Sequence, residues 1–204
     1  MLTKDVYDIF KDKKVQLFVA HHDDESLYFG GLLTEIRRFS KIKITVLTDP
    51  APNRPDTNTR LNSFKNVCWI LDCTYSAYDC KDYAPINENP KEVVYRDFDK
   101  ICDIVKNDVF GFKPDIVLTH NPDGEANLVY KGGHPMHKMI TDAVLTVLRL
   151  DRPIFACSVS GKHDFEVTYD VGHKKILLDC YAPRWTPKDY PFAYNTERYV
   201  KLCL

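Results

Sequence analysis

The sequence predicts an α/β fold: a Rossmann-like three-layer sandwich around a mainly parallel sheet, forming a single domain over residues 1–204. Segments typical of strands alternate with segments typical of amphipathic helices, which is the pattern of βαβ units. The length of 204 residues and the hydrophobic content of 44% suit one domain with a substantial core. The chain shows no internal repeat or linker that would mark a second domain.

The N-terminal half contains two predicted strands, each followed by a predicted helix. The apolar runs Val15–Ala20 and Ile42–Leu47 are short enough to be buried strands. Apolar residues three and four positions apart predict helices at Glu25–Phe39 and Thr59–Leu71. The proline-rich loop 49–58 follows the second strand, so we expect it at the same sheet edge as the end of the first strand.

The C-terminal half continues this alternation. Short apolar runs predict strands at Ile116–Thr119, Ile154–Ser158 and Glu166–Tyr169. Helical spacing of apolar residues predicts helices at Val94–Asn107, Pro135–Leu148 and Lys174–Tyr181. Right-handed crossovers would then bring the C-terminal ends of the first and third strands to one edge of the sheet.

A polar cluster stands directly after the first predicted strand. It reads His21-His22-Asp23-Asp24-Glu25 and leads into the next helix. In α/β sheets, ligands and catalytic groups lie at the C-terminal ends of strands. Imidazole nitrogens and carboxylate oxygens are ligands that zinc and similar ions accept, so this turn is predicted to supply part of a metal site.

The strand at 116–119 also ends in polar residues, and the helix after it begins with histidines. Pro135 suits a first helical turn, where a backbone donor is not needed. His134 and His137 are three residues apart, which places them on one helix face where both can point at one ion or substrate. The sequence therefore predicts the second part of the site here.

Together these residues resemble a known family. Ala20 to Glu25 is similar to the Ala/Pro-His-Pro-Asp-Asp-Glu motif of the PIG-L/LmbE-like zinc-dependent N-deacetylases, which are N-acetylglucosaminyl deacetylase-like enzymes. The His-x-x-His at 134–137 looks like the distal motif of that family, and order, spacing and strand context match. The resemblance covers Lys14 to Leu204.

The resemblance implies a role for each of five residues. His21, Asp24 and His137 would bind Zn²⁺, or another divalent metal such as Fe²⁺, and leave a position open for water. Asp23 would be the general base, since adjacent residues on a turn diverge and it cannot easily share the ion with Asp24. His134 would face the substrate carbonyl and stabilise the tetrahedral oxyanion.

Further residues are expected to contact substrate: Arg60, His120, Asn121 and Tyr130. In the family, an arginine like Arg60 contacts a substrate hydroxyl or phosphate, but a solvated first-turn arginine explains it equally well. Ser63 also stands where the family has glutamate. The segment 126–132 is longer than in the family, and Tyr130 or Lys131 would replace the usual aromatic residue near the oxyanion.

Other polar residues have simpler interpretations. His22 stands where the family has proline and is interpreted as a surface or internally satisfied histidine, with a substrate contact as the alternative. Glu25 is interpreted as a favourable charge at a helix N-terminus or as support for a ligand. The role of His120 stays open, and His163 and His173 are assigned to the surface.

Composition excludes several classes of protein. A net charge of −1 gives no argument for nucleic acid as a partner. The first residues lack the basic segment and apolar core expected of a signal peptide, and no apolar run approaches the about 20 residues that a membrane-spanning helix needs. The 7 cysteines form no Cys-x-x-Cys pair, so we expect free thiols and a cytoplasmic location.

The spacing of the motifs predicts a hydrolytic metal site, and the resemblance implies a metal-dependent amide hydrolase whose substrate is an amino sugar of the N-acetylglucosamine type, or its conjugate, that loses its N-acetyl group. One alternative is a deacylase of the same superfamily acting on another N-acyl compound. Another is a non-catalytic sugar-binding module, although a binder would not need Asp23 as a base. A dinucleotide-binding protein is disfavoured because no Gly-x-Gly-x-x-Gly follows the first strand. The expected partner is a small amino sugar, and the oligomeric state is left open.

Overall fold

The computed structural model describes residues 4–48, 57–81, 84–86, 89–125, 133–148, 151–158, 163–181 and 196–202. The strands in these ranges are β1 (Lys14–Val19), β2 (Lys41–Thr48), β3 (Thr74–Cys80), β4 (Ala84–Ile86), β5 (Asn89–Val94), β6 (Ile116–Thr119), β7 (Ile154–Cys157), β8 (Phe165–Val167) and β9 (Glu197–Lys201). The helices are α1 (Lys4–Phe10), α2 (Asp24–Ile36), α3 (Thr57–Leu71), α4 (Phe98–Phe112), α5 (Pro135–Leu148) and α6 (Val171–Asp179).

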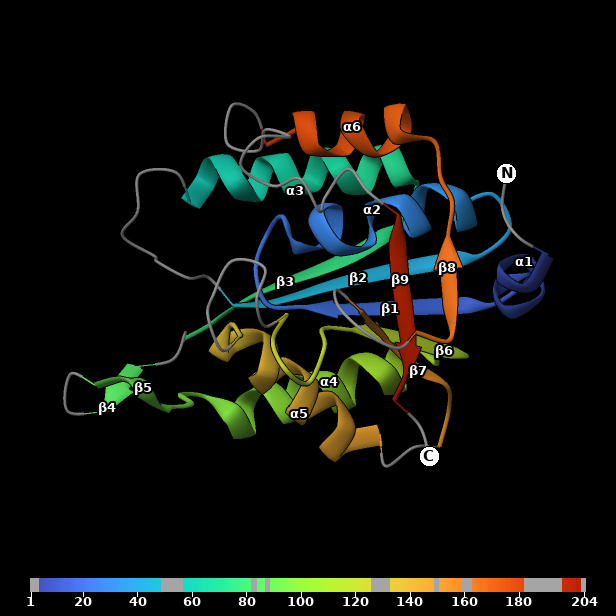
Figure 1. Cartoon of the computed structure of the whole chain (residues 1–204). Coiled ribbons are helices and arrows are strands. Elements are labelled where there is room, and N and C mark those ends of the chain that lie inside the picture. Colours follow the sequence, from blue (N-terminus) through green and yellow to red (C-terminus); the bar gives the residue numbers. More distant parts are fainter. Residues whose placement is uncertain are drawn as a thin grey trace.

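A seven-stranded mixed sheet runs through the middle of the molecule in the order β3-β2-β1-β6-β7-β9-β8 (Figure 1). β1 pairs in parallel with β2 on one side and with β6 on the other, and β6 pairs in parallel with β7. β9 runs antiparallel to both of its neighbours, β7 and β8. Because parallel strands end at the same edge, the residues that follow β1 and β6 are brought together.

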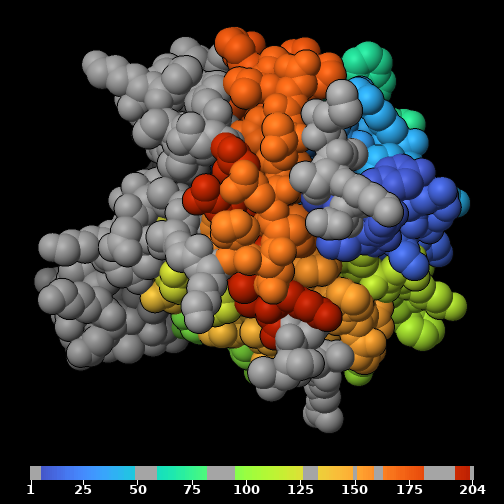
Figure 2. Space-filling view, turned by 45° about the vertical axis from the view of Figure 1, so that its right-hand side comes forward, coloured from blue at the N-terminus to red at the C-terminus, as the bar shows by residue number. Residues whose placement is uncertain are grey.

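Helices cover both faces of this sheet. α2, α3 and α6 lie on one face, and α4 and α5 lie on the other (Figure 1). Side chains of β1 alternate between the two layers: Leu17 joins the core cluster under α2, and Phe18 joins the cluster under α5. α6, β8 and β9 lie together on the side of the molecule shown in Figure 2. Among the described helices, none is both long and apolar enough to span a membrane.

The structure confirms the α/β class with a mainly parallel sheet, and the five predicted strands correspond to β1, β2, β6, β7 and β8. The start of the helix predicted at Val94–Asn107 is wrong. Val94 pairs with Ala84 in the β4–β5 hairpin, and α4 begins only at Phe98. Asp97 has a left-handed backbone with φ 57°, which separates the strand from the helix.

The apolar patterns of the sequence do not predict β9, because one of its inward-facing residues is charged. Glu197 is buried, and its carboxylate accepts hydrogen bonds from the backbone N–H groups of Gly31 and Leu32 in α2, at 2.7 and 2.8 Å. The fully buried Lys174 of α6 lies 2.6 Å from the same carboxylate, and the Tyr199 hydroxyl donates to it at 2.6 Å. This buried ion pair joins α6 and β9 to the helix that carries the first polar motif.

We expect Glu197→Gln to lower the free energy of unfolding by about 3–5 kcal/mol, because the change leaves the ammonium of Lys174 buried without a counter-charge. Denaturant unfolding measures the difference. Glu166→Gln is the matched control, since Glu166 on the neighbouring strand pairs with Arg198 at 2.9 Å in an exposed position. We expect the control to cost about 0–1 kcal/mol. Equal losses in the two variants would contradict a special role for the buried pair.

Candidate metal centre and active site

Asp24, the first residue of α2, lies at the centre of a buried group of histidines. Its Oδ1 is 3.5 Å from Nε2 of His137, and its Oδ2 is 3.2 Å from Nε2 of His120. Nδ1 of His21 is 3.6 Å from Oδ2, which also accepts the His21 backbone N–H at 2.8 Å. Although burial opposes ionisation, His137 and His120 hold the pKa of Asp24 well below its usual value. Asp24 is therefore an anion facing imidazole nitrogens.

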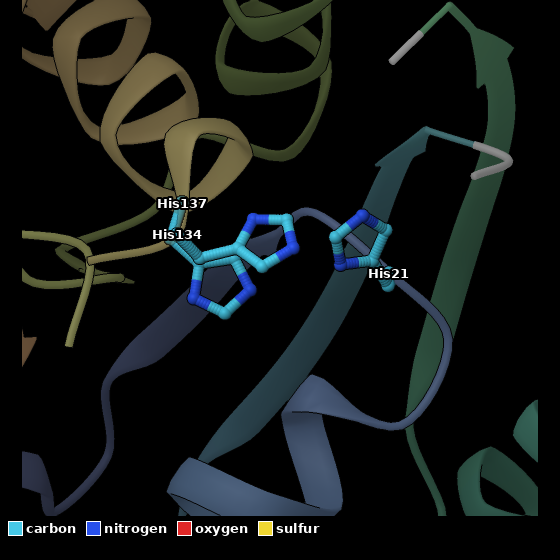
Figure 3. Close-up of side chains that lie close together, drawn as sticks. All are labelled: His21, His134 and His137. Atoms are coloured by element: carbon cyan, nitrogen blue, oxygen red, sulfur yellow. The ribbon is translucent and has the colours of Figure 1, made fainter. Parts of the chain in front are cut away.

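Two groups of candidate metal ligands share His137. His21, His134 and His137 form one group, and Asp24, His120 and His137 form the other, with the ligand atoms of each group within 4.8 Å of one another. The ring of His21 comes from the turn after β1 and faces the rings of His134 and His137 at the start of α5 (Figure 3). The fold therefore unites the two polar motifs, and the predicted ligands His21, Asp24 and His137 are drawn from both groups.

His134 is positioned as a hydrogen-bond donor. Its Nδ1 accepts the backbone N–H of Met136 at 3.2 Å. A neutral imidazole carries one proton, so this contact places the proton on Nε2. Burial, followed by the charge of His137, lowers the pKa of His134 to about 2, which keeps the ring neutral. Nε2–H of His134 can then donate to an oxygen but cannot act as a metal ligand.

Asp23 points to a different partner from Asp24. Its Oδ2 accepts from Nη2 of Arg60 at 2.7 Å, and the same nitrogen donates to the carbonyl of His22 at 2.7 Å. Burial raises the pKa of Asp23 to about 6, although the charge of Arg60 opposes this shift. Its backbone is unusual, with φ 122° and ψ −23°. Such strain persists where the surroundings over-determine it, as they do at functional sites.

Glu25 stabilises this strained turn through hydrogen bonds. Its Oε2 accepts the backbone N–H of Asp23 at 3.0 Å, and its Oε1 accepts the hydroxyls of Ser26 and Tyr181 at 2.7 and 2.8 Å. Burial raises the pKa of Glu25 to about 7. Of the two interpretations of Glu25, the structure favours a supporting role. A surface position for His22 is wrong, because this side chain is buried and its ring centroid is 5.2 Å from that of Phe64.

Glu125 is a site residue that the sequence patterns do not single out. Its Oε1 lies 3.1 Å from Nδ1 of His120 and also accepts the thiol of Cys157 and the backbone N–H of Asn121, each at 2.9 Å. Its Oε2 contacts Nδ1 of His137. One buried carboxylate thus holds two histidines whose other ring nitrogens face Asp24. Its only sequence signal is an acidic residue a few positions after the end of β6.

We expect Glu125→Gln to lower the affinity for a divalent metal by about 10–100-fold, because a carboxylate behind a ligating histidine orients the ring and raises its basicity. Competition with a chelating dye measures this affinity. Glu35→Gln is the control, since Glu35 is a buried glutamate of α2 that lies outside the candidate metal groups of the described residues. An unchanged affinity in Glu125→Gln would contradict the supporting role.

The residues expected to contact substrate lie in different surroundings. Arg60 reaches the site, where it binds Asp23. The ring of His120 is fully buried between Asp24 and Glu125, and its contact with substrate stays a prediction. Nδ2 of Asn121 donates to the carbonyl of Cys157 at 2.9 Å, which ties the end of β6 to β7. Tyr130, Lys131 and the loop residues 49–56 and 126–132 lie outside the described residues.

Solved structures share this fold at low sequence identity. N,N'-diacetylchitobiose deacetylase from Pyrococcus horikoshii, in complex with an inhibitor, aligns at a TM-score of 0.69 and 14% identity, over 98% of this chain and 86% of that one. The zinc-inhibited form of teicoplanin deacetylase Orf2 aligns at 0.61 and 13%, over 82% and 83%. GalB, the 4-carboxy-2-hydroxymuconate hydratase of Pseudomonas putida KT2440, aligns at 0.68 and 10%, over 94% and 97%. At these identities the likeness shows the fold alone.

Comparison with curated proteins finds no match. The comparison with family models does find one: the family described as "PIG-L: GlcNAc-PI de-N-acetylase" matches residues 16–148. This range begins in β1 and ends with α5, so it contains both polar motifs and every residue of the histidine cluster. The chain therefore belongs to the PIG-L family of de-N-acetylases.

Proposed function

We propose that this protein is a metal-dependent N-deacetylase that removes the N-acetyl group of an amino sugar of the N-acetylglucosamine type, or of its conjugate. The observation that carries the proposal is the separation of two adjacent carboxylates. Asp24 faces the histidines, whereas Asp23 is held apart from them by Arg60. A hydrolase needs both a metal ligand and a base, and the family match supplies the reaction class.

The residues of the cluster fit a divalent metal. Imidazole nitrogens and a carboxylate oxygen, buried and within 4.8 Å of one another, suit Zn²⁺ and also Fe²⁺. We assign His21, Asp24 and His137 to the ion. When bound, a divalent metal supplies Lewis-acid activation of water and of the substrate carbonyl.

The remaining chemistry belongs to side chains. Arg60 occupies Oδ2 of Asp23, so among the described contacts Oδ1 is the oxygen that can accept the proton of the attacking water. Asp23 then returns this proton to the leaving amine nitrogen as the C–N bond breaks. Nε2–H of His134 donates to the carbonyl oxygen as that oxygen gains negative charge.

The hydratase among the structural relatives shows that this fold serves more than one reaction. The choice of deacetylation therefore depends on the family match and on the separate base, not on the fold. Polar residues of the loops 49–58 and 121–133, among them Asn53 and Asp123, suit a ligand rich in hydroxyls. The cytoplasmic location expected from the sequence stays a prediction.

We expect metal-loaded protein to release acetate and free amine in equal amounts from N-acetylglucosamine-type sugars, and to lose this activity when a chelator is added. A panel of N-acetylated sugars, N-acyl sugars with longer chains and acetyl-lysine peptides tests the substrate. Activity on acetyl-lysine peptides alone would overturn the sugar assignment and leave the amide hydrolase. Tight sugar binding without turnover would favour a binding module instead.

A further inference from the structure

We propose that Tyr181 is a positioning residue for the general base, on which it acts through Glu25. The inference deepens the proposed function and rests on the role that Asp23 has in it. Tyr181 follows α6 and lies outside the residues 16–148 that match the family model, so the family match assigns it no role. Its proposed task is to fix the backbone of Asp23 and thereby the direction of the catalytic carboxylate.

Two hydrogen bonds connect Tyr181 to the base. The Tyr181 hydroxyl donates to Oε1 of Glu25 at 2.8 Å, and Oε2 of the same carboxylate accepts the backbone N–H of Asp23 at 3.0 Å. All three residues are buried, with 5% or less of each exposed. Water cannot readily replace these bonds in a buried place, so the carboxylate of Glu25 keeps the position that they define.

The backbone of Asp23 is the part of the turn that needs this support. With φ 122° and ψ −23°, it adopts a conformation that residues other than glycine rarely occupy. Nη2 of Arg60 holds the side chain by donating to Oδ2 at 2.7 Å, whereas Glu25 holds the backbone N–H. Release of this N–H would let the backbone relax and would redirect Oδ1, the oxygen assigned to the proton of the attacking water.

Tyr181 provides an anchor for Glu25 from outside its own helix. Oε1 of Glu25 also accepts the Ser26 hydroxyl at 2.7 Å, but Ser26 is the next residue of α2 and moves with Glu25. Tyr181 instead follows α6, which packs against α2, and its ring belongs to the hydrophobic core beneath that helix. Its backbone N–H donates to the carbonyl of Leu178 at 2.9 Å. Tyr181 therefore fixes the Glu25 carboxylate relative to the body of the protein.

Tyr199 provides a matched control. It is also buried, and its hydroxyl donates to a buried glutamate, Glu197, at 2.6 Å. Glu197 accepts from the backbone of Gly31 and Leu32 in the middle of α2, and not from the turn that carries Asp23. Replacement by phenylalanine removes one hydroxyl from each site. We expect the two variants to lose similar stability but to differ in catalysis.

The test combines kinetics with hydrogen exchange followed by NMR. In Tyr181→Phe, kcat on the best sugar of the panel should fall by about 10–100-fold, the loss typical when a partner that orients a functional group is removed. KM and metal content should stay unchanged. Exchange of the Asp23 backbone N–H should become faster, while exchange at Val19 in β1 reports any loss of global stability. Tyr199→Phe should keep both kcat and the rate of exchange at Asp23.

A double-mutant cycle tests whether Tyr181 acts through Glu25. Glu25→Gln keeps the shape of the side chain but offers one acceptor oxygen in place of two, so it should break the connection at one end and also lower kcat. If the two residues act in one chain of contacts, the double variant should lose no more activity than the more impaired single variant. Losses of kcat that multiply would overturn the proposed connection.

The outcomes separate this inference from the proposed function. Unchanged kcat in Tyr181→Phe, or equal losses in Tyr181→Phe and Tyr199→Phe, overturns the role of Tyr181 and leaves the deacetylase intact. Faster exchange at Asp23 with unchanged kcat also overturns it, because the contact would then be structural only. If the unmodified, metal-loaded protein cleaves no member of the panel, the proposed function itself is overturned.

Discussion

Asp23→Asn is expected to lower kcat by about 10²–10⁴-fold, the contribution that a general base typically makes. Asparagine has nearly the same shape and can still accept from Nη2 of Arg60, which now contacts Oδ2 of Asp23 at 2.7 Å. It cannot take a proton from water. The variant should therefore keep its fold and its metal content, and steady-state kinetics together with metal analysis of the same sample measure the difference.

Asp24→Asn is the control for this experiment, because it makes the same carboxylate-to-amide change at the adjacent residue. Asp24 contacts Nε2 of both His120 and His137, so its replacement should lower metal affinity as well as turnover. The roles assigned to the two residues would be wrong if both variants lost metal to the same extent. They would also be wrong if Asp23→Asn kept full activity.

His137→Ala is expected to abolish turnover and to leave the purified protein without stoichiometric metal. His137 is the one histidine common to both groups of candidate ligands that meet at the site, and it links Asp24 to Glu125. Its loss removes a ligand from every arrangement of the ion that these groups allow. Elemental analysis after desalting, and acetate release from the best sugar of the panel, give the two readouts.

His163→Ala serves as the control for this variant, since His163 is exposed and its nearest described charged partner is Glu166, at 4.0 Å. It should keep both metal and activity. Full metal content with full turnover in His137→Ala would rule out the site described above. If the variant lost turnover but kept its full metal content, His137 would be a catalytic group and not a metal ligand.

Local sequence patterns are sufficient to predict the fold class and the place of the site. Apolar runs and helical spacing are local properties, and they identify β1, β2, β6, β7 and the helices between them. Two polar clusters, each directly after a strand, predict a site where parallel strands end. The parallel pairing of β1 with β6 then brings His21 and His137 together as expected.

Contacts between segments that are distant in the sequence become visible only in the folded protein. Arg60 belongs to α3, and no local pattern indicates that it binds Asp23 rather than solvent. Glu125 looks like a loop residue until the fold places it behind His120 and His137. The charge of a residue is visible in the sequence, but the partner that makes its burial favourable is not.

The same reason explains why the patterns miss β9, one of four strands that they do not predict, the others being β3, β4 and β5. Glu197 interrupts the alternation expected of a half-buried strand, because a lone carboxylate inside a protein is strongly disfavoured. Lys174 makes its burial possible by approaching from α6, and the N–H groups of Gly31 and Leu32 complete the contacts. In the sequence, a charged residue argues against a buried strand because burying a charge is costly. The ion pair and hydrogen bonds that offset this cost form only in the folded protein.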